Sequence, residues 1–251
     1  MKKETDLDGI KSTARSFLYV DFHETKFSPM IIKHPFTDSG FVCLPHDDLI
    51  QPINILEDKK ALERWHDFMK ERINECSSPY QVYMLITKPY KFAFIKYAEK
   101  SMSKDDLSEI LADAWIITEE PNLDPNLSKT KLLSLFKSAN PEVLMNEEEL
   151  KAFNELEDTV TIYRGVTSYN ADNIKALSWT LDYDKAEWFA NRFGEEGTVY
   201  EAEIDKSHIL AYFGNFDFKE MKFNEHLEGK EIDIPDEDIN CDEDNSPAMQ
   251  M

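Results

Sequence analysis

Four polar residues in the second half of the sequence have types and positions that could support binding or catalysis. Arg164 lies near the end of the run TVTIYRGV, where a two-residue period puts it on the same strand face as Ile162. A guanidinium on a face that should be buried needs an anionic partner. Ser178 and Thr180 lie two residues apart in another strand-like run, so their hydroxyls project from one face, and Glu231 opens the last such run, EIDI.

Each of these residues also has a purely structural interpretation. Arg164 is equally satisfied by a structural carboxylate, because isolated ion pairs are common in proteins. Paired hydroxyls in a strand are usually sheet-compatible surface residues, and one glutamate among 50 acidic residues carries little information by itself. The order of the three elements along the chain is therefore needed to distinguish a functional role of these residues from a purely structural one.

Short strands and one helix must position these residues. The helix is predicted over DKAEWFANRFG, where Asp184 and Glu187 have capping-box spacing and Gly194 can end the helix. Its apolar spacing predicts a buried stripe of Ala186, Phe189, Ala190 and Phe193. The strands are predicted over TVTIYRG, ALSWTL, GTVYEAEI, HILAYF and KEIDI, which together favour antiparallel sheets.

The earlier part of the chain has a different pattern. Two strand-like stretches, SFLYVDF and GFVCLP, come first, and a series of helices follows from Asp58, which is placed to cap the first of them. Pro89 breaks a later apolar stretch into a helix pair, and Ser103 with Asp106 has capping-box-like spacing. The first helix of the series should bury Leu62, Trp65, Phe68 or Met69, and Ile73.

We therefore expect an α+β protein in three parts. Residues 1–155 form a mainly helical part, residues 156–235 a strand-rich part, and residues 236–251 an acidic flexible tail.

Composition restricts the partners of the protein. The 251 residues carry a formal net charge of −22 and a sequence pI of about 4.6, which disfavours nucleic-acid binding and favours a basic protein surface as partner. No apolar run reaches the roughly 20 residues that span a bilayer, so no membrane association is expected. Histidine and cysteine spacings predict no metal site. Three scattered cysteines indicate reduced thiols and a cytoplasmic location: Cys43, Cys76 and Cys241.

The order of the three polar elements resembles the arginine–serine–glutamate class of ADP-ribosyltransferases. The local phrases IYRGV, LSWTLDYDKAEWFANRF, VYEAEIDKSHILAYF and LEGKEIDIP carry the resemblance, which covers about residues 156–235. It implies a pair of packed antiparallel β-sheets around a cleft for NAD⁺, which the enzyme consumes as a substrate.

The resemblance also implies roles for individual residues. Arg164 would hold a phosphate or a ribose of the dinucleotide, since its planar fork of donors suits a diphosphate. Ser178 and Thr180 would brace the cleft, and Glu231 would bind the ribose 2′-hydroxyl and stabilise the positive charge that develops as nicotinamide leaves. With these four, the implied NAD-contacting set includes Tyr163, Gly165 and Phe189. The aromatic residues that offer stacking surfaces, most of them expected in the core, are Tyr163, Trp179, Trp188, Phe189, Tyr212 and Phe213.

One position departs from the family pattern. Members that modify arginine carry Glu or Gln two residues before the catalytic glutamate, where this chain has Gly229. Three functions therefore stay open: a transferase that modifies another acceptor on a target protein, an NAD glycohydrolase, and a catalytically silent acidic binding protein or inhibitor on the same fold. Compact acidic chains of this type resemble bacterial or bacteriophage effectors, which implies a target in the host cytosol. The helical part then serves either as a scaffold or in target recognition.

Overall fold

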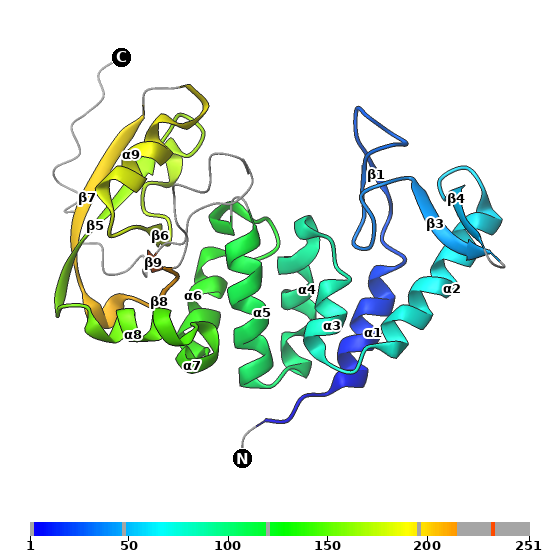
Figure 1. The fold of residues 1–251 in the computed structure, drawn as a ribbon, viewed down its shortest axis with the longest axis horizontal. Helices are drawn as coiled ribbons and strands as arrows, with labels where there is room; N and C mark the ends of the chain where they lie inside the picture. Colours follow the sequence, from blue (N-terminus) through cyan, green and yellow to red (C-terminus); the bar gives the residue numbers. More distant parts are fainter. Residues whose placement is uncertain (1–2, 47–48, 119–120, 195–196, 215–231, 234–251) are drawn as a thin grey trace. The chain divides into compact units, whose positions relative to one another are not determined.

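The computed structural model describes residues 3–46, 49–118, 121–194, 197–214 and 232–233 (Figure 1). The chain is mixed α/β, and its described part contains nine α-helices and small antiparallel sheets. It divides into two compact units. The first unit is Met1–Ser128 with Ser138–Asn140, and the second is Lys129–Lys137 with Pro141–Met251.

Five of the described helices belong to the first unit. They are α1 (Leu7–Phe17), α2 (Lys59–Glu75), α3 (Pro79–Met84), α4 (Lys91–Ala98) and α5 (Lys104–Ile117). Helix α1 packs against α2, α3 and α4, and α5 packs against α3 and α4. Ile10 of α1, Phe94 of α4 and Ile110 of α5 are fully buried, so these helices share one apolar core.

Local sequence signals explain where these helices begin. The Asp58 carboxylate accepts the Lys60 N–H at 2.8 Å before α2, as predicted. The Ser103 hydroxyl accepts the Asp106 N–H at 3.1 Å before α5, which confirms that cap. The predicted break at Pro89 is also confirmed, since a 3₁₀ turn separates α3 from α4 there.

The strands of the first unit form two small antiparallel pairs. The first joins β1 (His23–Glu24) to β2 (Ile32–Lys33), and the second joins β3 (Phe41–His46) to β4 (Leu49–Asn54). Strand β3 confirms the prediction over GFVCLP. The strand predicted over SFLYVDF is wrong, because α1 continues through Phe17. Ile10, Ala14 and Phe17 form a buried stripe at helical spacing, and this stripe extends into the run assigned to a strand.

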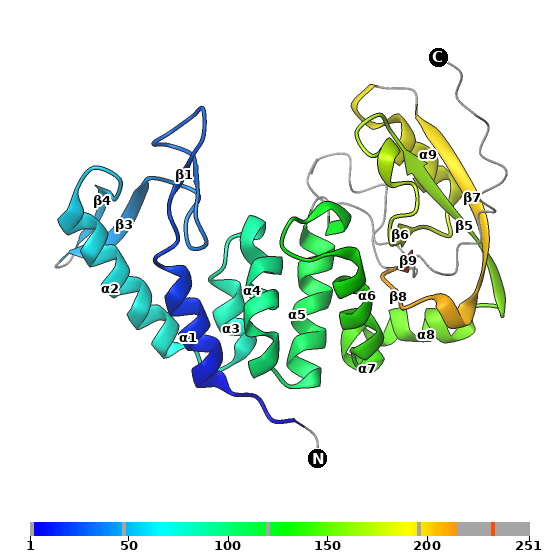
Figure 2. The same ribbon diagram turned by 180° about the vertical axis from the view of Figure 1, so that it is seen from behind.

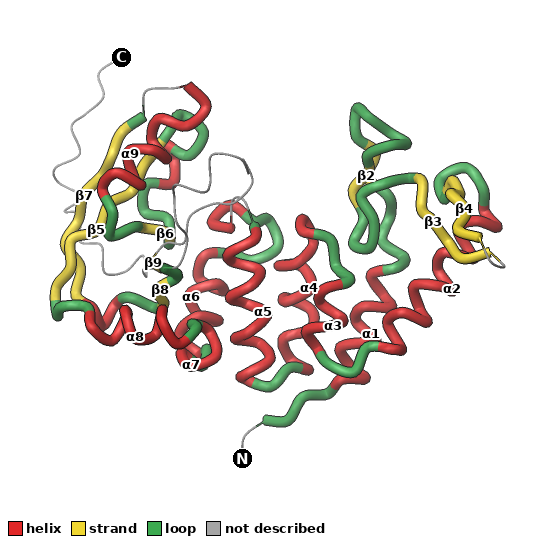
Figure 3. Tube along the Cα trace, in the orientation of Figure 1, coloured by secondary structure: helices red, strands yellow, loops and turns green. Residues whose placement is uncertain are grey.

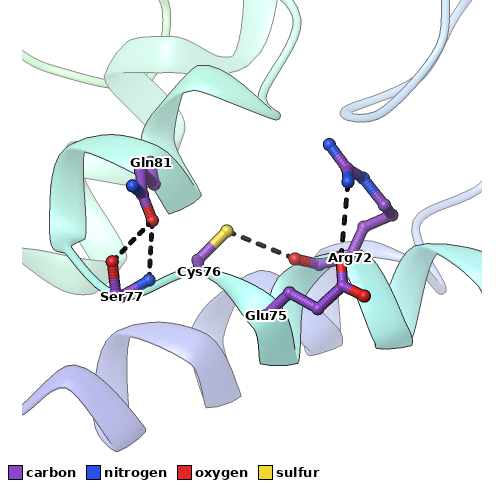
Figure 4. Close-up of polar contacts among 5 residues, drawn as sticks. All are labelled: Arg72, Glu75, Cys76, Ser77 and Gln81. Carbon is purple, nitrogen blue, oxygen red and sulfur yellow. Dashed lines mark hydrogen bonds and ion pairs between the residues drawn. The ribbon is translucent and has the colours of Figure 1, made fainter.

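The junction between α2 and α3 is tied by short-range polar contacts (Figure 4). The Cys76 thiol donates to the Arg72 carbonyl at 3.3 Å, and the Arg72 guanidinium lies 3.3 Å from the Glu75 carboxylate. The Gln81 side-chain carbonyl accepts the Ser77 N–H at 2.7 Å and the Ser77 hydroxyl at 3.1 Å. These contacts satisfy backbone groups where one helix ends and the next begins.

The second unit combines helices with the two longest described strands (Figure 2). Its helices are α6 (Lys129–Ser138, of which Ser138 belongs to the first unit), α7 (Pro141–Leu144), α8 (Glu147–Glu155) and α9 (Tyr183–Asn191). Its strands are β5 (Thr159–Val166), β6 (Ser178–Trp179), β7 (Thr198–Asp205), β8 (Ala211–Tyr212) and β9 (Ile232–Asp233). All five coincide with runs predicted as strands, although β5 and β7 each extend one residue beyond the predicted run. The second unit begins before residue 156, because it includes α7, α8 and most of α6, which were predicted to belong to the first part of the chain.

Two small sheets form the strand-rich region (Figure 3). Strands β5 and β7 pair antiparallel from Thr159↔Asp205 to Val166↔Thr198. Strands β6, β9 and β8 form the second sheet, in that order. An isolated antiparallel bridge between Tyr163 and Thr180 connects β5 to the end of β6. The two sheets are therefore linked side by side at the middle of β5.

A core cluster and a close helix contact hold β5 in place. Ile162 packs in a buried cluster with Trp179, Ile204 and Ile209. On the opposite face, β5 packs against α9, and Gly165 makes this approach possible. A Cβ at Gly165 would lie 2.1 Å from the Ala186 carbonyl oxygen, so no larger residue fits without movement of the helix.

The ends of α9 differ in part from the prediction. The helix cap is Asp182, whose carboxylate accepts the N–H groups of Asp184 and Lys185, so the predicted cap at Asp184 is wrong by two residues. Ala186 and Ala190 are buried as predicted, whereas Phe189 is half-buried. Gly194 has a φ of +72°, the left-handed conformation expected of a glycine after a helix.

Candidate functional site

Arg164 lies on the core-facing side of β5. It is half-buried, shares its face with the fully buried Ile162, and stands directly opposite Tyr200 in the β5–β7 register. Its guanidinium Nη1 donates to the Ser178 carbonyl oxygen. The strand pattern therefore predicted correctly that this cation points inward, and one of its contacts is to the second of the matched motifs.

Ser178 and Thr180 are both buried, at 4% and 6% exposure. The Tyr163 N–H donates to the Thr180 carbonyl at 2.7 Å, and the Thr180 N–H donates to the Tyr163 carbonyl at 2.9 Å. The Thr180 hydroxyl accepts the Asp182 N–H at 3.1 Å. Thr180 thus connects β5 to the cap of α9, which is a structural role that the sequence did not suggest.

Glu231, the predicted catalytic carboxylate, lies outside the described residues. The next residue, Ile232, begins β9 and pairs with Trp179 of β6 on one side and with Tyr212 of β8 on the other. Strand β6 in turn adjoins β5 through the bridge described above. The three strands that carry or follow the matched motifs are therefore neighbours in the order β5, β6, β9.

The remaining residues of the predicted NAD-contacting set lie on or near α9. The Tyr163 ring meets the exposed Tyr183 ring edge to face, with centroids 5.4 Å apart. Phe189 is half-buried, with its ring centroid 5.0 Å from Trp188 and 5.1 Å from the Arg192 guanidinium carbon. Gly165 is in close contact with α9, which gives this glycine a packing reason of its own.

The other predicted stacking aromatics divide between the core and the surface. Trp179 and Phe213 are buried, at 3% and 1% exposure, and the Trp179 indole N–H donates to the Ala176 carbonyl at 2.9 Å. Tyr212 is half-buried, and Trp188 is exposed. Only Trp179 and Phe213 of the six are buried, so the expectation that most of these aromatic residues lie in the core is wrong.

Glu149, a buried acid in the second unit, is not among the site residues predicted from the sequence. Its side chain is 4% exposed and completes a capping box with Asn146 at the start of α8. One carboxylate oxygen accepts the Asn146 N–H at 3.0 Å, and the other accepts the Gly214 N–H at 3.2 Å just after β8. Burial raises the pKa of the neighbouring Tyr212, and the charge of Glu149 adds to this shift. The signal was present in the run NEEEL, which has capping-box spacing.

A second polar cluster, with two buried and two half-buried members, lies among α3, α4 and α5 of the first unit. Lys91 is 5% exposed, and its ammonium lies 3.6 Å from the centroid of the Tyr83 ring and 3.4 Å from the Tyr83 carbonyl oxygen. The Asp113 carboxylate accepts hydroxyl groups from Tyr83 at 2.6 Å and Tyr80 at 3.3 Å. Burial lowers the pKa of Lys91 to about 8, and Asp113 opposes that shift.

Other features of the described residues restrict the chemistry. No group of three or more His, Cys, Asp or Glu side chains within the described ranges is arranged to hold a metal ion. Among the described helices, none is both long enough and apolar enough to cross a bilayer.

Comparisons with protein-family models, with curated proteins and with solved structures find no match to this chain.

Proposed function

We propose that the second unit is an NAD-dependent ADP-ribosyltransferase that modifies a protein target. The observation that carries this proposal is the adjacency of β5, β6 and β9. These strands bring Arg164, Ser178 and the residue that follows Glu231 into one region, although they are up to 68 positions apart in the sequence. A site that joins a cation, hydroxyls and a carboxylate suits a substrate with both a diphosphate and a reactive ribose.

The proposed reaction uses these groups in separate roles. The bond between C1′ of the nicotinamide ribose and the pyridinium nitrogen breaks, and its electron pair goes to nicotinamide. The ribose then carries positive charge, which the Glu231 carboxylate stabilises through the 2′-hydroxyl and by direct electrostatic attraction. A nucleophilic side chain of the target attacks C1′ and loses its proton to solvent. Arg164 holds the diphosphate while this happens.

Release of nicotinamide at saturating NAD⁺ tests the proposal directly. Glu231→Gln keeps the size of the side chain and removes its charge, so turnover should fall by about 10²-fold or more, while NAD⁺ binding changes little. Glu228→Gln removes an acid three residues earlier and should leave turnover within a few-fold of the unmodified protein. If Glu228 proved essential and Glu231 dispensable, the assignment of the last motif would be wrong.

A second measurement distinguishes transfer from hydrolysis. The purified protein is incubated with biotin-tagged NAD⁺ and bacterial lysate, and labelled proteins are then identified. Labelled protein that disappears in Glu231→Gln supports transfer. Nicotinamide release without labelled protein, in lysate and in buffer, would instead establish an NAD glycohydrolase. Absence of both activities would leave the acidic binding protein as the function of this fold.

A further inference from the structure

Strand β7 has one unoccupied edge in the described part of the chain. It pairs with β5 along all of Thr198–Asp205 and with no other described strand. Figures 1 and 2 show β7 on the outside of the second unit, with α9 and the shorter strands on its inner side. An edge of this length presents a row of backbone donors and acceptors that another strand can use.

The register shows which backbone groups face this open edge. Tyr163 exchanges both backbone hydrogen bonds with Thr180, so its N–H and C=O point away from β7. Its partner across the ladder is Glu201, and the pair Tyr163↔Glu201 is therefore a non-hydrogen-bonded pair. The N–H and C=O of Glu201 consequently point to the open edge, and those of Glu203, two residues further on, do the same.

The side chains along this edge form a row of carboxylates. Glu201, Glu203 and Asp205 are exposed and alternate along β7, so they lie on one face. The carboxylates of Glu201 and Glu203 make no ion pair or hydrogen bond with any described residue. That of Asp205 accepts the Ser207 N–H at 2.8 Å. The same residues thus offer backbone hydrogen bonds and negative charge to an incoming strand.

We propose that the open edge of β7 binds an extended segment of a basic protein by strand addition. Lysine or arginine at alternate positions of that segment would lie opposite Glu201 and Glu203, where cross-strand pairs of opposite charge are favourable. Backbone hydrogen bonds supply affinity, and the alternating charges supply specificity. A second copy of this chain is a poor occupant, because two such edges would place like charges together. This proposal does not depend on the proposed NAD chemistry.

Two labelled heptapeptides of equal composition test whether binding requires lysines at alternate positions of the added segment. One alternates lysine and threonine, KTKTKTK, and the other groups them, KKKKTTT. Binding to the full chain is measured by fluorescence anisotropy at 150 mM salt. The alternating peptide should bind about tenfold more tightly, because only it presents all four lysines to one face of the added strand. Equal affinity for the two peptides, or no binding of either, would overturn the proposal.

Backbone pairing is tested by amide hydrogen exchange with and without the alternating peptide. Strand addition should slow exchange at the amides of Glu201 and Glu203, while attraction between charges alone should not. Glu203→Gln should weaken binding by removing one charge, and Glu203→Pro should weaken it further by removing the edge-facing N–H as well. Proline at this position leaves the β5–β7 ladder intact, since that N–H is not used there.

The matched control removes two exposed carboxylates elsewhere. Glu57→Gln with Glu63→Gln changes the net charge by the same amount as Glu201→Gln with Glu203→Gln, but in the first unit. Only the β7 pair should weaken binding of the alternating peptide, by about tenfold or more. Equal losses in both double variants would reduce the effect to net charge and reject the site. Association of the free protein into dimers with protected β7 amides would identify a second copy as the occupant and reject the basic partner.

Discussion

Acid should destabilise the first unit through His34. This side chain is 1% exposed and lies among aromatic rings, with its centroid 4.7 Å from Phe22 and 5.2 Å from Trp65. Its Nδ1 accepts the Phe36 N–H at 3.2 Å, and its Nε2 has no hydrogen-bond partner among the described residues. Protonation would therefore place a charge in an apolar site, where the nearby backbone of Leu18 and Val20 compensates only part of the desolvation cost.

The size of the effect follows from the pKa of His34. Burial lowers this pKa from 6.5 to about 4, against a smaller opposing contribution from the backbone of Leu18. Because the folded-state pKa is below the unfolded one, the unfolded chain binds the proton first as pH falls. Stability is thus complete above about pH 6.5 and declines below it. Proton linkage gives a loss of about 2 kcal/mol between pH 7 and pH 5, with a limit of about 3 kcal/mol below pH 4.

Urea unfolding at pH 7, 6 and 5, followed by tryptophan fluorescence, measures this loss. Carboxylates titrate over the same range, so the informative quantity is the difference from a variant without the imidazole. His34→Asn keeps an oxygen that can accept the Phe36 N–H and removes the titration. The variant should lose packing and be less stable at pH 7, yet its stability should change by about 2 kcal/mol less between pH 7 and pH 5. Parallel curves for the two proteins would refute a buried neutral histidine.

Three substitutions examine other buried groups. Lys91→Met should raise the melting temperature at pH 7, because burial lowers the folded-state pKa of Lys91 to about 8 and so disfavours its charge. This gain in stability should shrink as the pH rises from 8 towards 10.5, where the lysine of the unfolded chain also loses its proton. Gly165→Ala should cost about 1–3 kcal/mol in urea unfolding, since its Cβ would lie 2.1 Å from the Ala186 oxygen, and an unchanged midpoint would contradict the close contact. Glu149→Ala should cost a similar amount, about 1–3 kcal/mol, by the same measurement, because it leaves the N–H groups of Asn146 and Gly214 without their carboxylate acceptor, whereas Glu147→Ala, at an exposed position of α8, should have little effect.

Local sequence signals predicted the positions of the helices and the longer strands. They were poorer at predicting which strands pair with one another. Asp58 and Ser103 cap helices as expected, because a cap depends on residues within one turn. Strands β6 and β9 are only two residues long, and their pairing joins positions more than 50 residues apart. The predicted runs contain both strands, but nothing local determines that Ser178 pairs with Asp233.

Two of the incorrect predictions, the strand over SFLYVDF and the helix cap at Asp184, also have local causes. SFLYVDF has the composition of a strand, yet the stripe of Ile10, Ala14 and Phe17 continues the preceding helix into it. Asp182 and Asp184 are both acceptable helix caps by type. Asp182 is selected because its backbone is extended and its N–H is held by the Thr180 hydroxyl.

Two neighbouring residues of the YRG motif, Arg164 and Gly165, are subject to different physical constraints. Gly165 faces α9 and must be small for the helix to approach β5, so a glycine there follows from packing alone. Arg164 faces the opposite side, beside Tyr200, and donates to the Ser178 carbonyl. An apolar side chain would satisfy that face better if packing were the only requirement, because a half-buried guanidinium carries a desolvation cost. The functional interpretation of the resemblance therefore depends on Arg164 and on the role proposed for Glu231. Loss of nicotinamide release in Glu231→Gln tests that role.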